Sequence, residues 1–197
     1  MNFDTISEPL EQRLAEGLAR LAALARQTDW KTADSAQLTP TQAEVLRFAA
    51  SRSEGVRLSA AAAHIGVRNA TASDTVSALE RKGLVQKHPD PRDARAIAIK
   101  ASESGLKLAQ SWPLGFIPVV SALTGQEREL LFGLVVQAIR RLQVRGDIAP
   151  QRLCVTCRYF RENVAPESDE PHFCALVGAP MGTRHLRIDC PEQEALA

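Results

Sequence analysis

The sequence predicts a mainly α-helical α+β fold, in which two short helices joined by a tight turn are followed by a two-stranded hairpin. Residues 59–65 and 69–82 are rich in helix formers, and Gly66 between them accepts the positive φ angle that a sharp helix-to-helix turn needs. Residues 84–88 and 96–100 read as strands, the second with a period of two. This order of elements is that of a winged helix-turn-helix.

The N-terminal region is predicted to be largely helical. Between residue 6 and about residue 26, leucines recur at spacings of three and four, as in an amphipathic helix of about five turns; they are Leu10, Leu14, Leu18, Leu21 and Leu24. Residues 27–38 are predicted to form a loop. Thr39, Pro40 and Gln42 then make a capping box, so a further helix is expected from Pro40 to about Ala50.

The two short helices and the hairpin, residues 59–100, form the predicted reader. Ser59 is expected to cap its first helix and Asn69 its second. One face of the second helix is small or apolar and should face the core, through Ala72, Thr75, Val76 and Leu79. The other face is polar, with Asn69, Thr71, Ser73, Asp74, Ser77 and Arg81. A polar face at a helix N-terminus suits hydrogen bonds to base edges in a major groove, although a merely solvated surface has the same composition.

The hairpin supplies a second reason to expect DNA binding. Its turn, residues 89–95, combines turn formers with Arg92 and Arg95. A hairpin whose tip carries guanidinium groups can lie along DNA and place one arginine in the minor groove, where negative potential is concentrated. Residues 66–100 hold seven Lys or Arg against four Asp or Glu, whereas the whole chain has a net charge of only +1. The prediction of DNA binding therefore depends on a local basic patch.

The region after the hairpin is predicted to form two helices and an apolar connection. Ser102 is expected to cap a helix that is interrupted at Trp112-Pro113, because proline lacks the backbone donor. Thr124 and Glu127 form a second capping box, which begins a helix reaching about Val144. Its buried side is expected to contain Leu130, Leu131, Leu134, Val135, Ala138 and Leu142.

These apolar-faced helices exceed what a small reader can cover, which indicates a homodimer. The leucine row of residues 6–26 could instead pack within its own domain. A dimer would place two reader helices about 34 Å apart, as a palindromic site requires.

The segment LVQKHPDPRDARAIAIKASESG, residues 84–105, resembles the hairpin and following helix start of the MarR family of bacterial repressors. The resemblance extends over roughly residues 6–142. It implies that Asn69, Thr71, Ser73 and Ser77 face base edges or nearby phosphates, and that Lys87 and Arg92 face phosphates. It also implies that Asp93 braces Arg95, which reaches the minor groove. Asp74 departs from the family, whose members often carry arginine there, so either the helix is rotated or the base preference is unusual.

Length and composition set the domain organisation. A chain of 197 residues that is 45% hydrophobic suits one domain, residues 1–150, with a small appendage, residues 151–197. No apolar run approaches the roughly 18 residues of a membrane span, and the N-terminus lacks the pattern of a secretory signal. The protein is therefore expected to be cytoplasmic, with no membrane partner.

All four cysteines lie in the appendage: Cys154, Cys157, Cys174 and Cys190. Disulfides are disfavoured in the cytosol, and four thiols in a segment too small for its own core suggest a metal that replaces the missing core. Buried structural cysteines and a redox pair at Cys154 and Cys157 are the alternatives. Four thiolates suit Zn²⁺, the commoner structural choice, and also an iron–sulfur cluster. His172 and His185 are weaker candidate ligands.

The sequence thus predicts a homodimeric transcriptional regulator, of the repressor type, that binds a palindromic site in double-stranded DNA. The signal could be a small aromatic effector, as the resemblance implies, or the metal or redox state of the cysteines. A metal-stapled protein–protein interaction module and a redox-active thiol protein are the alternatives. An enzyme is not expected, because no histidine and acid stand at recognisable spacing from a nucleophile and no glycine-rich phosphate loop is present.

Overall fold

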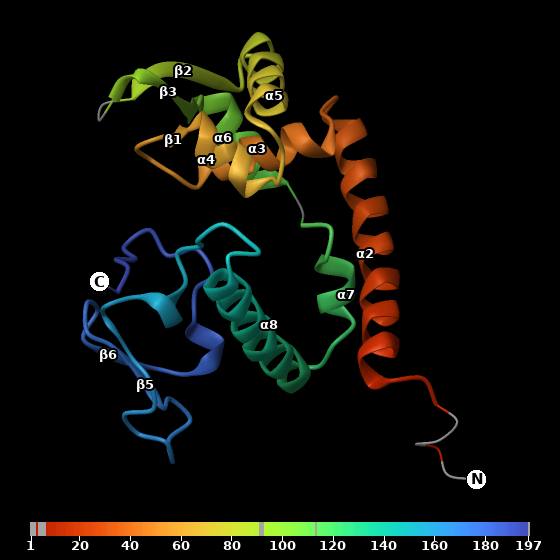
Figure 1. Ribbon diagram of the computed structural model, residues 1–197, viewed down its shortest axis with the longest axis vertical. Coiled ribbons are helices and arrows are strands. Elements are labelled where there is room, and N and C mark those ends of the chain that lie inside the picture. Colours follow the sequence, from red (N-terminus) through yellow and green to blue (C-terminus); the bar gives the residue numbers. More distant parts are fainter. Residues whose placement is uncertain (1–2, 4–6, 91–92, 113, 197) are drawn as a thin grey trace.

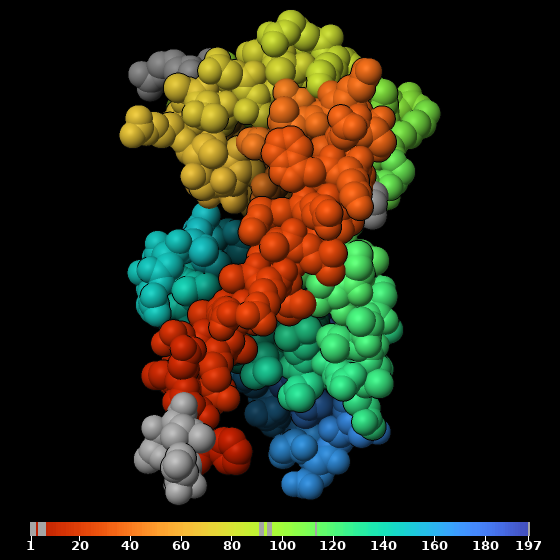
Figure 2. Space-filling view, turned by 90° about the vertical axis from the view of Figure 1, so that its right-hand side faces the viewer, coloured from red at the N-terminus to blue at the C-terminus, as the bar shows by residue number. Residues whose placement is uncertain are grey.

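The computed structural model describes residues 3, 7–90, 93–112 and 114–196, with the side chains of Ala94 and Arg95 left undescribed. The reader, together with the preceding helix of residues 40–50 that packs against it, lies at one end of the molecule. The C-terminal segment, residues 151–196, lies at the other end. A long helix, α2, Leu10–Ser35, runs along the side of the molecule (Figure 1). In the space-filling view, α2 crosses the face turned to the viewer, and α7, Ile117–Ser121, lies beside it (Figure 2). None of the helices in the described part of the chain is both long and apolar enough to span a membrane.

Helix α2 runs from Leu10 to Ser35, so it includes most of the segment that was predicted to be a loop. The prediction of a loop over residues 27–38 was therefore wrong for most of this segment. Two threonines in it form hydrogen bonds with carbonyl groups of the helix, so the helix continues through them. The hydroxyl of Thr28 donates to the Leu24 carbonyl and that of Thr32 to the Thr28 carbonyl, both at 3.1 Å. Ala33, one turn from the end, is fully buried in the reader core. Packing on the reader therefore extends this helix beyond its leucine row.

The predicted capping box at Thr39 and Gln42 is confirmed, and α3 spans Pro40–Ala50. Helix α4 spans Leu58–His64 and α5 spans Asn69–Arg81. Both begin earlier than predicted, since Arg57 and Arg68 take the extended N-cap positions. Ser59 and Asn69 are thus helical residues and not caps. Gly66 has a φ of +67° and makes the predicted turn.

A three-stranded antiparallel sheet follows, with the order β1-β3-β2. The hairpin strands are β2, Val85–Asp90, and β3, Asp93–Ala101, which are longer than predicted. The sequence analysis missed β1, Val56–Arg57, which pairs with Ile99 and Ala98 of β3. The core of the reader lies between the sheet and helices α3 and α5, and its largest fully buried residues are Val45, Leu46, Val76, Leu79, Val85 and Ile99.

Helix α6, Glu103–Ser111, begins with the predicted cap, where the Ser102 hydroxyl accepts a hydrogen bond from the Gly105 N–H at 3.1 Å. It ends at the buried Trp112, as predicted, and Pro113 lies outside the described residues. Close packing requires a glycine at position 105, because a Cβ atom there would lie 2.0 Å from the Leu84 carbonyl oxygen. The tight contact joins α6 to the start of the hairpin.

Gly105→Ala is therefore expected to lower the free energy of unfolding by about 1–3 kcal/mol, the usual cost of overpacking. Gly125→Ala is the matched control, because nothing lies within 4 Å of the Cβ that it adds. Urea unfolding of both variants measures the difference. Equal stabilities for the two would contradict the packing of α6 on the hairpin.

Helices α7, Ile117–Ser121, and α8, Gly125–Arg145, follow. The second capping box, at Thr124 and Glu127, is confirmed, and Gly146 ends α8 with a φ of +78°. The predicted buried side of α8 is wrong for the single chain, since Leu130 and Leu134 are 68% and 62% exposed. The chain instead buries the other side of α8, with Phe132, Val136 and Ile139, beneath the C-terminal segment.

The C-terminal segment, residues 151–197, forms a second small sheet that the sequence analysis did not predict. Its strands have the order β4-β5-β6, and they are β4, Phe160–Arg161, β5, His172–Cys174, and β6, Ala179–Met181. Two single-turn 3₁₀ helices, η1, Cys154–Thr156, and η2, Thr183–His185, complete it. Its buried residues Leu153, Val155, Met181 and Leu186 share one core with Val136 of α8. The division of the chain at residue 150 stays a prediction.

Candidate nucleic-acid interface

The N-terminal turn of α5 presents the polar surface that was predicted to contact bases. Asn69 and Thr71 are exposed, and Ser73 and Ser77 are partly exposed on the same helix. Ala72, Val76 and Leu79 are fully buried on the opposite side, which fixes the rotation of the helix. Asp74 is exposed among the polar residues, so the helix is not rotated to hide it. An exposed carboxylate can accept from a cytosine amino group, and this contact of Asp74 with DNA stays a prediction.

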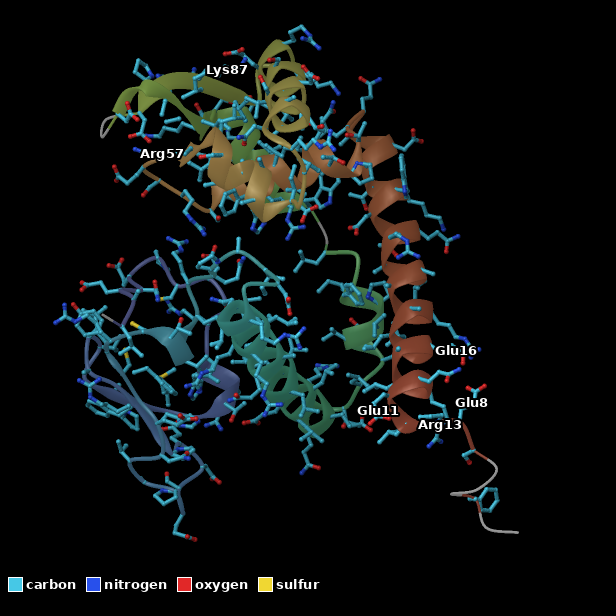
Figure 3. All side chains as sticks on the ribbon, in the orientation of Figure 1. Glu8, Glu11, Arg13, Glu16, Arg57 and Lys87 are labelled. Atoms are coloured by element: carbon cyan, nitrogen blue, oxygen red, sulfur yellow. The ribbon has the colours of Figure 1, made fainter. Side chains whose placement is uncertain are left out.

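Helix α5 and strand β2 are joined by Lys87. Its ammonium donates to the Ser77 hydroxyl at 2.9 Å and pairs with the Glu80 carboxylate at 3.0 Å. Figure 3 labels Lys87 between β2 and α5. Ser77 and Lys87 therefore hold the hairpin against the helix, and the direct DNA contacts predicted for them stay predictions.

The tip of the hairpin carries the remaining predicted residues. Arg92 lies outside the described residues, and the structure describes Arg95 in β3 without its side chain. Asp93 begins β3 and is partly exposed. The pairing of Asp93 with Arg95 and the contacts of both arginines with DNA stay predictions.

The base of the hairpin is braced by an ion pair that the sequence analysis missed. Arg57 Nε lies 2.5 Å from Oδ2 of Asp90, and its Nη2 donates to Oδ1 at 3.3 Å. Asp90 is buried at the end of β2, and its hydrogen bond and charge raise the pKa of Arg57. Figure 3 shows Arg57 on the side of the hairpin away from Lys87. The hairpin is therefore fixed on two sides, to α5 through Lys87 and to β1 through Arg57.

The four cysteines are free thiols, each partly buried, and backbone hydrogen bonds bring their segments together. The Phe160 N–H donates to the Cys157 carbonyl at 3.0 Å, and Phe160 pairs with Cys174 across strands β4 and β5. The Cys190 N–H donates to the Arg152 carbonyl at 2.9 Å, close to Cys154 in the chain. In Figure 3 the yellow sulfur atoms lie within this segment.

The surroundings of Cys154 act on the pKa of its thiol. Its sulfur accepts a hydrogen bond from the Arg187 N–H at 3.2 Å. Burial raises the pKa of the Cys154 thiol, the hydrogen bond lowers it, and electrostatic repulsion by the other three cysteines adds to the rise. Even so, within the described ranges no three or more His, Cys, Asp or Glu side chains are arranged to hold a metal ion. The four-cysteine metal site stays a prediction.

The two histidines of this segment have other partners. Nδ1 of the buried His172 accepts from the Asn163 N–H at 3.2 Å, and Nδ1 of His185 accepts from the Gly182 N–H at 3.0 Å. Both act as acceptors within the local fold. They are therefore poorer candidates for ligands than the cysteines.

Comparison with known proteins gives a fold and a match of part of the chain to one family model. The MarR family model matches residues 38–97. MepR of Staphylococcus aureus in its DNA-binding conformation has a TM-score of 0.56 and 21% identity, over 66% of this chain and 98% of that one. A MepR–DNA complex has a TM-score of 0.53 and 22% identity, over 68% and 99%. At these identities, the likeness shows a mainly helical winged helix fold, to which this chain adds the small C-terminal sheet.

A second solved relative is CouR from Rhodococcus jostii RHA1, bound to p-coumaroyl-CoA. It is 29% identical, over 53% of this chain and 73% of that one, with a TM-score of 0.48. No protein in the curated set matches the sequence.

Proposed function

We propose, from the match of residues 38–97 to the model of the MarR family of transcriptional regulators, that the chain is a homodimeric repressor that binds a palindromic site in double-stranded DNA. The observation that carries the proposal is the exposed first turn of α5, with Asn69 and Thr71, beside a hairpin fixed to the same helix. This arrangement fits a major groove with the helix and an adjacent minor groove with the wing. A cytoplasmic location is part of the proposal.

The exposed leucines support the dimer. Leu10, Leu14 and Leu18 of α2 are between 55% and 66% exposed, and Leu130 and Leu134 of α8 are exposed to a similar degree. Apolar rows of this size on two helices are typical of a surface covered by a second subunit. A symmetric pair of chains would cover them and would present two copies of α5 to one duplex.

Binding to duplex DNA that weakens steeply with salt is the direct test. Arg95→Ala is expected to weaken binding to most sequences and to lower the slope of log K against log salt by about one, because one phosphate-region contact is lost. Arg161→Ala, which removes an exposed charge from the C-terminal segment, should leave the slope unchanged. Fluorescence anisotropy at several salt concentrations measures both. A slope unaffected by Arg95→Ala would place the wing away from DNA.

The second part of the proposal is a metal centre held by Cys154, Cys157, Cys174 and Cys190. A single Zn²⁺ would draw four sulfurs to about 2.3 Å from one point. Zn²⁺ is slightly favoured as the commoner structural choice for four thiolates, and an iron–sulfur cluster is the alternative. Elemental analysis and a visible spectrum of anaerobically purified protein distinguish the two metals. A small aromatic effector remains a further proposed signal.

A further inference from the structure

The C-terminal segment contacts the reader through a carboxylate that lies between two arginines. Oδ2 of Asp189 lies 2.7 Å from Nη1 of Arg52, in the turn after α3, and its Oδ1 lies 2.6 Å from Nε of Arg152. Nη2 of Arg152 also donates to the carbonyl of Ser51 at 3.2 Å. We name this set of contacts, formed by Arg52, Asp189 and Arg152, the clasp. The two arginine side chains are only 17% and 24% exposed, so solvent screens the clasp less than it screens an exposed ion pair.

The part of the C-terminal segment that forms the clasp is packed on α8. Leu153 follows Arg152 in the chain and is fully buried in the core that the segment shares with Val136 of α8. Leu186, which lies three residues before Asp189, belongs to the same core. Both clasp residues of the segment are therefore anchored to α8 through a buried neighbour.

On the reader side, Arg52 is packed on the helices that support α5. Its guanidinium lies over the Phe48 ring, 4.8 Å from the ring centroid. Phe48 of α3 stacks on His64 of α4, with ring centroids 4.0 Å apart. Helices α3 and α4 both pack against α5. The clasp thus connects α8, through the C-terminal segment, to the two helices on which α5 rests.

The reader has another attachment, to α2. Ala33 of α2 is buried in the reader core, and the turn after α2 is held by Lys82 at the end of α5. Nζ of Lys82 donates to the Gln37 carbonyl, and it donates to Oε1 of Gln42 at 3.0 Å. Gln37 has a φ of +54°, in the left-handed region that favours glycine. A body attached at one turn can rotate about that turn, whereas a body attached at two separate places cannot.

The surroundings of the clasp are loosely packed. A cavity of about 430 Å³ beside the clasp is lined by residues that include Arg47, Gln110 and Ile188. Another cavity, of about 470 Å³, lies between α4 and α8 and is lined in part by Ile65 and Ile139. Close-packed surfaces resist relative displacement, whereas gaps leave the connection to a few polar contacts. The clasp is therefore the firm contact between the reader and the C-terminal segment at this place.

We propose that the clasp holds the reader at a fixed position relative to α8, so that Arg52 and Asp189 are positioning residues that set the spacing of the two half-sites in DNA. This inference rests on the proposed function, since it needs a homodimer in which α8 contacts the partner subunit. It does not depend on what the cysteines hold. When both readers are fixed to the dimer contact, the two copies of α5 fit half-sites at one separation only.

The test measures how DNA affinity depends on the spacing of the half-sites. The parent duplex is a palindrome selected by the full-length protein from random sequence, and a second duplex has one base pair inserted at its centre. The insertion rotates one half-site by about 35° relative to the other, so two fixed readers bind it only when the duplex is deformed. Because deforming DNA is costly, the unaltered chain is expected to bind the longer duplex about 10-fold or more weakly.

Arg52→Gln is expected to flatten this dependence on spacing. Kd for the parent duplex should rise by about 3- to 10-fold, because the readers are no longer held in place before they bind, and the inserted base pair should cost less than about 3-fold. Asp189→Asn should behave in the same way. Arg52→Lys keeps a cation beside Asp189 and should restore the steep dependence. A loss of stability alone would weaken binding to both duplexes equally.

Glu194→Gln is the matched control, because it breaks an ion pair with Arg158 within the C-terminal segment and leaves the clasp intact. It should keep the steep dependence on spacing. The inference is overturned if the unaltered chain binds both duplexes equally well, or if Arg52→Gln keeps the steep dependence.

The distance between the two readers separates failure of the inference from failure of the proposed function. A spin label introduced as a non-natural amino acid in place of Gln86, which is exposed on β2, reports this distance in the dimer without DNA. The distance distribution should be narrow in the unaltered chain and in Arg52→Lys, and broad in Arg52→Gln. A dimer that binds no duplex would refute the proposed DNA binding, and equal widths of the distributions would then overturn the inference as well. A monomeric protein would overturn both.

Discussion

Replacing Leu130 and Leu134 of α8 together by glutamate is expected to turn a dimer into a monomer. These side chains are 68% and 62% exposed in the single chain, so the change should cost little in the folding of one subunit. In a dimer each leucine contributes about 1.5–3 kcal/mol of apolar burial, and four buried charges would replace the four leucines. Because a palindromic site is bound by two linked readers, DNA affinity should fall by about 100-fold or more.

Sedimentation velocity and anisotropy with a palindromic duplex measure the two effects. Leu176→Glu is the control, since Leu176 is also exposed, at 48%, but lies in the turn between β5 and β6, far from α8 in the chain. It should leave the protein dimeric. A dimer that survives the double substitution would show that this face of α8 is not part of the dimer surface.

Cys157→Ser is expected to abolish metal binding and to loosen the whole C-terminal segment. Structural metal sites contribute apparent binding energies of about 10–16 kcal/mol in small zinc domains, so a metal held by the cysteines would be a large part of the stability of this segment. The segment's own buried residues are Leu153, Val155, Met181 and Leu186, and its strands are two or three residues long. Without metal, this core has little to hold it together.

Metal content and limited proteolysis measure the outcome. Cleavage should move into residues 151–197, while the reader, with its separate core, stays resistant. Ala175→Ser is the matched control, because Ala175 is exposed next to Cys174 and the change leaves all four thiols in place. Metal retained at full occupancy in Cys157→Ser would remove this cysteine from the ligand set.

The sequence alone was sufficient to predict features that depend on residues close together in the chain. The capping boxes at Thr39 and Thr124 and the turn at Gly66 depend on residues within one helical turn, and all three are confirmed. The exposed polar turn of α5 follows in the same way from helical periodicity. The fold class and the positions of Asn69 and Thr71 could therefore be predicted.

The sequence alone did not predict contacts between residues that are far apart in the chain. Arg57 and Asp90 are 33 residues apart, and Arg52 and Asp189 are 137 apart, so neither pair has a local signature. Strand β1, with two residues, is defined only by its pairing with β3. The loop predicted for residues 27–38 was wrong because burial of Ala33 in the reader core is a tertiary effect. The buried face of α8 was misassigned because the C-terminal segment covers a side that periodicity alone did not favour.

In the proposed dimer, helix α8 has two different partners. Val136 and its neighbours belong to the core of the C-terminal segment, while Leu130 and Leu134 are exposed on the single chain. An ordinary amphipathic helix can change its outer residues freely, but in the proposed dimer the outer leucines of α8 would contact the second subunit. A shift or rotation of α8 that improved one contact would then disturb the other, so the helix would tie the evolution of the C-terminal segment to that of the subunit contact.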